Sequence, residues 1–285
     1  MNSVPNLEPG QAVELSVSVV LHHSDVQQLA CCLLSLRDSA LEAINRGLLA
    51  YATVSLVDNS CEERYRVAVD GVIDSLGDDP GLSFELLSLA ENRGFGHAHN
   101  RVMDSVSTDL HLVLNPDTEL ETETLSAGIT AIIEENAVLV SPRVIGAQGH
   151  QEFLCKRYPS VLLLFLRGFA PRALRRWFDP QLSRYEMRDV CSGDNRADIT
   201  IASGCFMLVR VSALRDVGVF DDRYFLYFED FDLSTRLKNS GRLVYAPAMR
   251  IKHYGGYAAR KGFRHVRYFV RSAVRFFHQH GWRWV

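Results

Sequence analysis

Apolar stretches rich in β-branched residues alternate with amphipathic stretches over the first 120 residues, and this alternation limits the folds open to the chain. Four apolar stretches, each predicted to be a β-strand, occupy residues 14–23, 51–60, 82–90 and 109–117. Strands that alternate with helices form a mostly parallel sheet with helices packed on its faces. We therefore predict an α/β fold, in which ligands bind beyond the carboxyl ends of the strands.

The second half of the chain is less regular, and residues 155–196, rich in Arg and Leu, give no clear assignment. Residues 1–13 are predicted to be a loose leader. The other expected elements are strands over 137–145 and 199–214 (the latter running into a helix), a helix from about Phe228 to Gly241, and a strand ending near His253.

Charge is distributed unevenly along the chain. The formal net charge is −3, but residues 233–285 contain 12 Lys and Arg and no acidic residue, which leaves −15 on residues 1–232. The acidic body argues against nucleic-acid binding, whereas the basic end suggests an anionic partner there. The N-terminus lacks the features of a signal peptide, and six cysteines without metal-ligand spacing fit a reducing compartment. We expect a cytoplasmic protein.

Polar residues follow the predicted strands where a ligand would bind. Asp58 ends the second strand, where its carboxylate can accept the imide N–H of uracil or thymine, or cap the following helix. Asn92, Gly94 and Gly96 lie in a predicted strand-to-helix turn. Glycines allow a ligand to approach the backbone, and a helix start offers N–H groups to an anion, although an ordinary turn fits as well.

The fourth strand ends at Asn115-Pro116-Asp117. An apolar strand that delivers a carboxylate to a turn suggests a site for a divalent metal or a polar ligand. A plain turn is the alternative.

The segment "FLYFEDFDLSTRL" places Glu229, Asp230 and Asp232 among aromatic residues at a predicted helix start. Carboxylates in apolar surroundings have raised pKa values, as a general base working near neutral pH requires. Acidic groups at a helix start also stabilise the helix dipole, but three carboxylates exceed what capping needs. We therefore favour a catalytic role here, whereas His253, judged alone, fits a buried histidine with satisfied hydrogen bonds.

Taken together, these motifs resemble those of the family 2 inverting GT-A glycosyltransferases. The order and spacing of that family are matched by "VSVVLHHSD", "LVDNS", "NRGFGHAHN", "LNPDTEL", "GCFMLVR" and "FDDRYFLYFEDFDLSTRLKNSG". The NPD, GF and YFED forms are especially similar to the bacterial rhamnosyltransferase branch. The resemblance covers about residues 14–256 and implies a GT-A fold, a single Rossmann-like domain with a mostly parallel mixed sheet flanked by helices. Its nucleotide-binding half would span about 14–120 and its acceptor half about 121–256.

The resemblance also implies a role for each candidate residue on the nucleotide side. Asp58 would hold the pyrimidine base, and Asn92 with Gly94 would line the nucleotide pocket. Asp117 would bind a divalent metal, Mg²⁺ or Mn²⁺, that bridges to the diphosphate. His253 would match a late histidine that joins the metal in some relatives.

One position departs from the family pattern. Metal-dependent members usually place two aspartates one residue apart, and the first of these is Asn115 here. Because Mg²⁺ and Mn²⁺ keep several waters and take further ligands from substrate phosphates, Asp117, helped by His253, is expected to be enough. Asn115 would hydrogen-bond the ribose or a metal-bound water.

On the acceptor side, the resemblance makes Asp230 the general base and Glu229 its neighbour that binds the acceptor. The implied enzyme is a hexosyltransferase that moves a sugar, with L-rhamnose from dTDP-L-rhamnose as the first expectation, to a hydroxyl of a cell-surface glycan or lipid-linked acceptor. UDP-sugars remain open as donors. A non-catalytic sugar-nucleotide-binding module is a further alternative. A sugar-phosphate nucleotidyltransferase is disfavoured because the first predicted strand lacks a following Gly-rich basic loop.

The C-terminal residues 257–285 are predicted to form a basic amphipathic helix. Its arginines at 260, 264, 267, 271 and 275 fall on one stripe, mostly opposite Phe263, Val266, Phe269, Val270, Ala273 and Phe277. Such a helix either lies on an anionic membrane leaflet or docks on its own protein. Many relatives act on lipid-linked acceptors, so we expect peripheral contact with the inner face of the cytoplasmic membrane.

Overall fold

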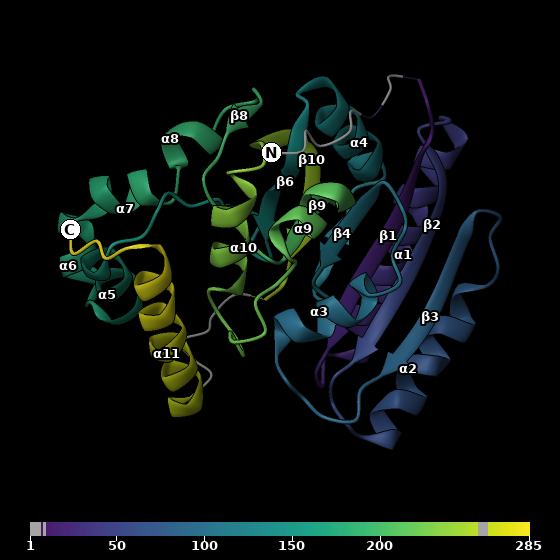
Figure 1. Cartoon of the computed structure of the whole chain (residues 1–285), viewed down its shortest axis with the longest axis horizontal. Helices are drawn as coiled ribbons and strands as arrows, with labels where there is room; N and C mark the ends of the chain where they lie inside the picture. The colour runs from purple at the N-terminus through teal and green to yellow at the C-terminus, as the bar shows by residue number, and fades with distance from the viewer. Residues whose placement is uncertain (1–6, 8–9, 256–261) are drawn as a thin grey trace.

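A mixed β-sheet forms the centre of the protein (Figure 1). The computed structural model describes residue 7 and residues 10–255 and 262–285. Within these residues the strand order is β3-β2-β1-β4-β9-β6-β10-β5, with β7 paired to β6 and β8 paired to β10. The strands are β1 (Val13–Leu21), β2 (Leu49–Asp58), β3 (Leu82–Ser88), β4 (Leu110–Leu114), β5 (Thr118–Leu120), β6 (Ala137–Gly146), β7 (Gln151–Glu152), β8 (Ala197–Asp198), β9 (Phe206–Arg210) and β10 (Arg242–His253).

The N-terminal half of the sheet is parallel, as the alternation of strands and helices predicts. Strands β3, β2, β1 and β4 pair in parallel, so their carboxyl ends share one edge. Strand β9 then runs antiparallel to both β4 and β6, while β6 and β10 are parallel. The fold is thus α/β with a mixed sheet, and the parallel half brings the polar strand ends together.

Eleven helices lie within the described ranges, and some of them cover the two faces of the sheet. They are α1 (Val26–Asn45), α2 (Glu63–Leu76), α3 (Phe95–Met103), α4 (Thr124–Glu134), α5 (Val161–Phe169), α6 (Arg172–Trp177), α7 (Asp179–Tyr185), α8 (Arg188–Cys191), α9 (Val211–Val217), α10 (Glu229–Leu237) and α11 (Phe263–His280). Helices α1 and α4 pack over one face of the sheet, where α1 contacts β5 and α4 contacts β6 and β10. Helices α3 and α9 pack over the other face. Two buried apolar clusters follow from this arrangement, one on each side of the sheet.

The helices α5 to α8 and α11 form a lobe beside the sheet, at the left of Figure 1. We call these helices and the C-terminal residues 281–285 the helical lobe. An aromatic cluster that includes Tyr185, Phe228, Phe276 and Phe277 joins the lobe to α10. The lobe is therefore attached to the body through side-chain packing near the start of α10. No helix in the described ranges is long and apolar enough to cross a bilayer.

Several predicted boundaries change. Residues 199–205 are turn rather than strand, apart from an isolated bridge at Ile201, because the chain must bend there before entering β9. Val13, predicted to be part of the leader, already belongs to β1. The predicted helix over 257–285 spans Phe263–His280, since Gly281 ends it at a backbone φ of 105°. Its N-terminal part, including Arg260, lies outside the described residues.

Candidate active site

The turn before β9 joins three segments that carry predicted site residues. The Gly204 N–H donates to Oδ2 of Asp230 at 3.0 Å, and the Cys205 carbonyl accepts from the Asn115 N–H at 2.9 Å. A Cβ added to Gly204 would lie 3.3 Å from the ring of Phe95, at the start of α3, and 3.4 Å from Cβ of Asp230. The Asn115 turn, the start of α3 and the Glu229-Asp230 pair therefore lie close together in the structure.

Asp117 and His253 lie together at the edge where β5 pairs with β10. Nε2 of His253 is 3.7 Å from Oδ1 of Asp117, and its Nδ1 is 3.1 Å from Oε2 of Glu152. The Tyr254 N–H donates to the Asp117 carbonyl at 2.9 Å, which fixes the two strands at this point. An alanine at 255 would displace the Asp117 carboxylate, because an added Cβ would lie 2.0 Å from its Oδ2.

This arrangement fits a divalent metal that shares its coordination with a substrate. Oδ1 of Asp117 is buried and has no hydrogen-bond partner, so it is free to bind a cation. His253 has one ring nitrogen toward Asp117, while Glu152 contacts the other nitrogen, as outer-shell carboxylates do for metal-binding histidines. The described residues contain no cluster of three or more His, Cys, Asp or Glu side chains suited to a metal. Further ligands would have to come from phosphate oxygens and water.

Asp58 and Asn92 organise the loops at the ends of β1 to β3. Asp58 is buried and its Oδ1 accepts the Ser60 N–H at 2.8 Å, whereas α2 begins after Glu62. Helix capping, one of the two alternatives for Asp58, is therefore not its role here. Oδ1 of Asn92 accepts from the Gly94 N–H and from Nδ2 of Asn59, both at 3.0 Å.

Gly94 allows the turn before α3 to pack against the backbone of Phe225, so this part of the glycine backbone contacts protein rather than a ligand. Its φ is 108°, in the region that favours glycine, and an added Cβ would lie 2.3 Å from the Phe225 carbonyl oxygen. The next residue, Phe95, donates its N–H to that same oxygen at 3.0 Å. The glycine-rich turn thus holds the segment that leads to Glu229.

Glu229 and Asp230 begin α10 in different surroundings. Glu229 is buried, and Oε2 has no hydrogen-bond partner. Burial, followed by the charge of Asp230, raises the pKa of Glu229 well above its usual range. Desolvation also raises the pKa of Asp230, but the N–H groups of Gly204 and Phe231 and the charge of Arg167 oppose that rise. The pair therefore combines a carboxylate held by amides with a neighbour that favours the protonated form.

The turn before Glu229 has an unusual backbone. Tyr227 and Phe228 both adopt left-handed conformations, with φ of 69° and 67°, which are rare for bulky residues. Helix α11 supports this turn: the Tyr227 hydroxyl lies 2.9 Å from Nδ1 of His265, and the Phe228 ring packs 5.2 Å from that of Phe269. Such strain persists only where surrounding contacts hold it in place.

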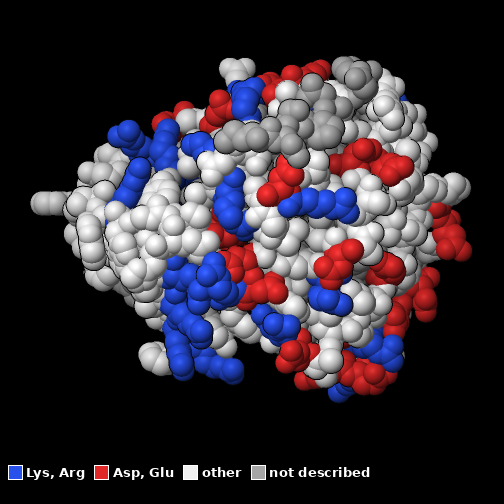
Figure 2. All heavy atoms as spheres, in the orientation of Figure 1, with Lys and Arg blue, Asp and Glu red and all other residues white. Residues whose placement is uncertain are grey.

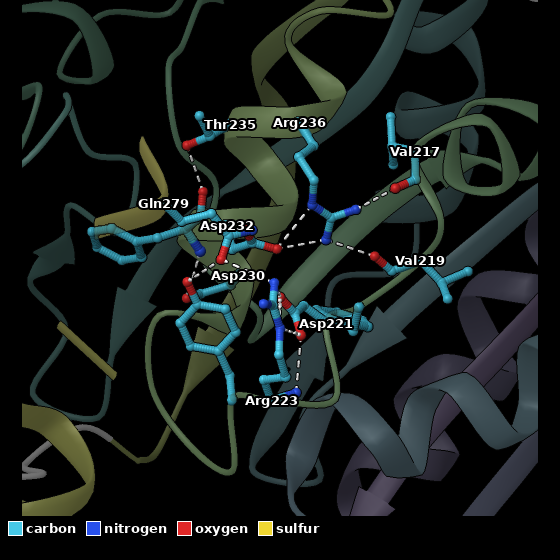
Figure 3. Close-up of polar contacts among 12 residues, drawn as sticks. Val217, Val219, Asp221, Arg223, Asp230, Asp232, Thr235, Arg236 and Gln279 are labelled. Carbon is cyan, nitrogen blue, oxygen red and sulfur yellow. Dashed lines mark hydrogen bonds and ion pairs between the residues drawn. The ribbon is translucent and has the colours of Figure 1, made fainter. Parts of the chain in front are cut away.

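A buried polar network joins α10 to α11 one turn further along (Figure 3). The carboxylate of Asp232 is fully buried, and its Oδ2 accepts a hydrogen bond from Nη2 of Arg236 at 2.6 Å. Its Oδ1 accepts a hydrogen bond from Nε2 of Gln279 at 3.0 Å and lies 2.7 Å from Nε2 of His280. The arginine also donates to the carbonyls of Val217 and Val219. Asp232 is thus a structural residue of this network.

The sequence analysis did not identify several residues that shape the site. Glu152 belongs to the two-residue strand β7, and Gly204 and Cys205 lie in a loop that carries no local signal apart from the "GCFMLVR" motif. Asn59 has a buried Oδ1 without a hydrogen-bond partner beside Asn92. The adjacency of Asn59 to Asp58 was the available signal, whereas nothing local pointed to Glu152.

The chain is similar to curated bacterial rhamnosyltransferases. It is 30% identical to rhamnosyltransferase WbbL of Escherichia coli K12 over 197 residues, which cover 64% of this chain and 69% of the relative. It is 28% identical to N-acetylglucosaminyl-diphospho-decaprenol L-rhamnosyltransferase of Mycobacterium tuberculosis H37Rv over 186 residues. That alignment covers 59% of this chain and spans only 58% of the mycobacterial relative's length. No protein-family model matches the chain.

Solved glycosyltransferases share the fold. A structure of GalNAc-T7 with UDP, GalNAc and Mn²⁺ has a TM-score of 0.64 at 14% identity, covering 94% of this chain and 48% of that one. The mannosyltransferase PcManGT of Pyrobaculum calidifontis, in complex with GDP-Man and Mn²⁺, has a TM-score of 0.61 at 15% identity, covering 96% and 67%. The motifs, the fold and the WbbL relationship agree: the chain belongs to the rhamnosyltransferase-like branch of the family 2 GT-A glycosyltransferases.

Proposed function

We propose that this protein is an inverting glycosyltransferase that moves L-rhamnose from dTDP-L-rhamnose to a hydroxyl of a glycan or lipid-linked acceptor. The observation that carries the proposal is the meeting of the Asn115 turn and Asp230 at Gly204 and Cys205. A donor-binding turn and a base must be adjacent if a sugar is to pass directly from donor to acceptor. The names of the WbbL and mycobacterial relatives support rhamnose as the sugar.

Donor binding is assigned to the carboxyl ends of the parallel strands. Asp58 would accept the imide N–H of the base, and Asn92 and Gly94 would shape the nucleotide pocket. Asp117 and His253 would hold Mg²⁺ or Mn²⁺, and Asn115 would bond the ribose or a metal-bound water. When bound, the metal would neutralise charge on the departing diphosphate. The Mn²⁺ in the GalNAc-T7 and PcManGT structures supports this expectation.

Acceptor activation is assigned to the Glu229-Asp230 pair. Asp230 would take the proton of the acceptor hydroxyl as its oxygen attacks the anomeric carbon from the face opposite the leaving group. The C–O bond to the diphosphate breaks as the new glycosidic bond forms, so the anomeric centre inverts. The amide donors at Asp230 hold its carboxylate in one orientation, and Glu229, whose buried Oε2 has no hydrogen-bond partner, would bind the acceptor.

The acceptor is proposed to be lipid-linked, at the inner face of the cytoplasmic membrane. The mycobacterial relative is named for a diphospho-decaprenol acceptor. Arg264, Arg267 and Arg271 lie on the exposed face of α11 with Phe263, whose side chain is 84% exposed. Figure 2 shows basic side chains gathered over this part of the molecule, whereas acidic ones dominate the sheet-bearing part. Peripheral attachment through α11 would bring the acceptor near the site.

Thermal unfolding with dTDP, UDP or GDP, each with and without Mn²⁺, tests the proposal. A ligand at about 100 times its dissociation constant stabilises the folded state by roughly 2.7 kcal/mol. For a chain of this size that raises Tm by several degrees. We expect a Mn²⁺-dependent shift with dTDP.

The other outcomes are equally informative. A shift with UDP instead of dTDP would retain the enzyme class and select a UDP-sugar donor. Binding without sugar transfer to any acceptor would favour a non-catalytic sugar-nucleotide-binding module. The absence of a shift with every nucleotide would contradict the proposal.

A further inference from the structure

An open cavity of about 600 Å³ lies in the helical lobe, outside the residues assigned above. A cavity of this volume is in the range that accommodates small-molecule ligands. Its charged lining consists of Arg167, Arg175, Arg176, Arg188, Asp179 and Glu186. We call it the arginine cavity.

Two of its four arginines already have carboxylate partners. Glu186 pairs with Arg188 at 2.6 Å and with Arg167 at 3.3 Å, and Arg188 also pairs with Asp179 at 3.2 Å. Arg175 and Arg176 are exposed, and neither pairs with a carboxylate in the described part of the chain. The lining therefore has a surplus of two positive charges, located on these two neighbouring side chains.

The lobe that contains the cavity packs against the turn that leads to the proposed acceptor site. Helix α7, which supplies part of the cavity wall, ends at the buried Tyr185, and that ring belongs to the same aromatic cluster as Phe228. Arg167 is near enough to Asp230 for its charge to oppose the rise in the pKa of that carboxyl, a rise that desolvation causes. Arg167 thus belongs to the cavity lining and also acts on the carboxyl of Asp230.

The lining of the arginine cavity also has an apolar part, formed by Ala173 and Leu182. Residues three apart share a face of a helix, whereas adjacent residues do not. The exposed Leu174 and Trp177 therefore lie on a different face of α6 from Arg175 and Arg176, outside the cavity lining. Two unpaired arginines beside apolar side chains suit an amphiphile whose anionic group is attached directly to a hydrocarbon chain.

We propose that the arginine cavity binds the diphosphate of a polyprenyl-diphosphate-linked acceptor, with Arg175 and Arg176 as its main anion ligands and Ala173 and Leu182 against the first isoprene unit. The proposal rests on the function proposed above and adds the site for the acceptor's anionic group. Guanidinium groups match phosphate oxygens in pairs of hydrogen bonds. The two unpaired charges complement a diphosphate better than a neutral sugar.

Binding of farnesyl diphosphate to the full chain, measured by calorimetry beside farnesol, tests the site. We expect farnesyl diphosphate to bind and R175A/R176A to weaken that binding at least about tenfold, since charge-assisted hydrogen bonds are lost. K238A/R250A removes the same charge from two exposed residues outside the cavity and is expected to bind like the wild type. R175K/R176K keeps the charge and should recover part of the affinity.

Vesicles of phosphatidylglycerol separate the two sources of phosphate. If R175A/R176A lost vesicle binding while retaining its affinity for farnesyl diphosphate, the two arginines would serve a membrane surface and the proposal would be wrong. Equal binding of farnesol and farnesyl diphosphate by the wild type would also overturn it, as would an equal loss in K238A/R250A.

Failure here is distinguishable from failure of the proposed function. A normal Mn²⁺-dependent shift with dTDP, together with no effect of R175A/R176A on farnesyl diphosphate, would contradict only the arginine cavity. Binding of farnesyl diphosphate through these arginines without any nucleotide shift would contradict the glycosyltransferase and leave an anion site.

Discussion

Nε2 of His280 lies 2.7 Å from Oδ1 of Asp232, so the C-terminal helix α11 contacts α10, the helix whose first turn contains the proposed base Asp230. Asp232 is fully buried, and Gln279 of the same helix contacts it as well. Helix α11 is therefore part of the scaffold around Glu229 and Asp230. Its inward face packs on the protein, while Phe263 and Val270 remain exposed.

Replacing His280 with Ala is expected to lower the free energy of unfolding by about 1.5–3 kcal/mol, because a hydrogen bond to a buried carboxylate is lost. Urea denaturation measures this loss. The control His278→Ala changes an exposed residue on the same helix and should stay within about 0.5 kcal/mol of the wild type. Equal stability of both variants would show that the contact with Asp232 contributes nothing.

Replacing Asp230 with Asn is expected to lower kcat by about 100-fold or more, since removing a general base typically costs between 10²- and 10⁴-fold. Sugar transfer to acceptor measures kcat, and the shift in Tm with dTDP and Mn²⁺ should remain. Asp216→Asn, at an exposed position on α9, is the matched control and should retain activity. Wild-type turnover in Asp230→Asn would rule out this base.

Replacing Asn115 with Asp restores the two-aspartate pattern and is expected to tighten Mn²⁺ binding in the absence of nucleotide, because a second carboxylate is added beside Asp117. Asp117→Asn should abolish the Mn²⁺-dependent part of the dTDP shift. Titration with Mn²⁺ measures the first effect and thermal unfolding the second. A metal-dependent shift that survives in Asp117→Asn would place the metal elsewhere.

Replacing Gly255 with Ala is expected to weaken Mn²⁺-dependent nucleotide binding without altering a proposed ligand. The added Cβ would lie 2.0 Å from Oδ2 of Asp117, so the carboxylate must turn away from its present position. Gly71→Ala, where an added Cβ meets no atom within 4 Å, is the control. If both variants gave the wild-type shift, the orientation of Asp117 would not matter for binding.

Acid is expected to destabilise the protein through its buried histidines. Burial lowers the pKa of His111 to about 3 and lowers the pKa of His99 well below its usual value. The unfolded chain therefore binds more protons than the folded one between about pH 6.5 and pH 3, and stability falls as pH falls through that range. For His111 alone the loss between pH 7 and pH 5 is about 2 kcal/mol.

Urea denaturation of the wild type and His111→Gln at pH 7 and pH 5 measures this contribution, because carboxylates titrate in both proteins. The variant should lose less stability on acidification. An equal loss of stability in both proteins would mean that folding does not lower the pKa of His111. The bonds of His111 to Ser16 and Ser18, at 2.7 and 2.8 Å, are the contacts that protonation would disturb.

The sequence by itself determined the parallel half of the sheet and the candidates at its edge. Runs such as that of β1 are apolar and β-branched because both faces of a parallel strand are buried, so local composition reveals them. The positions of these runs in the sequence then place Asp58 and Asp117 at the carboxyl ends of predicted strands. Their motifs, in order, were enough to indicate the family, which the WbbL relationship confirms.

Only the tertiary structure decided how these pieces meet. Glu152 reaches His253, and Gly204 contacts Asp230, through pairings between residues far apart in the chain, and no local pattern encodes such contacts. The same holds for α11. Its arginine stripe is visible in the sequence, but the fit of Phe276 against α10 and the lobe decides which face is buried. Periodicity specifies that a helix has an apolar face, whereas packing specifies what covers it.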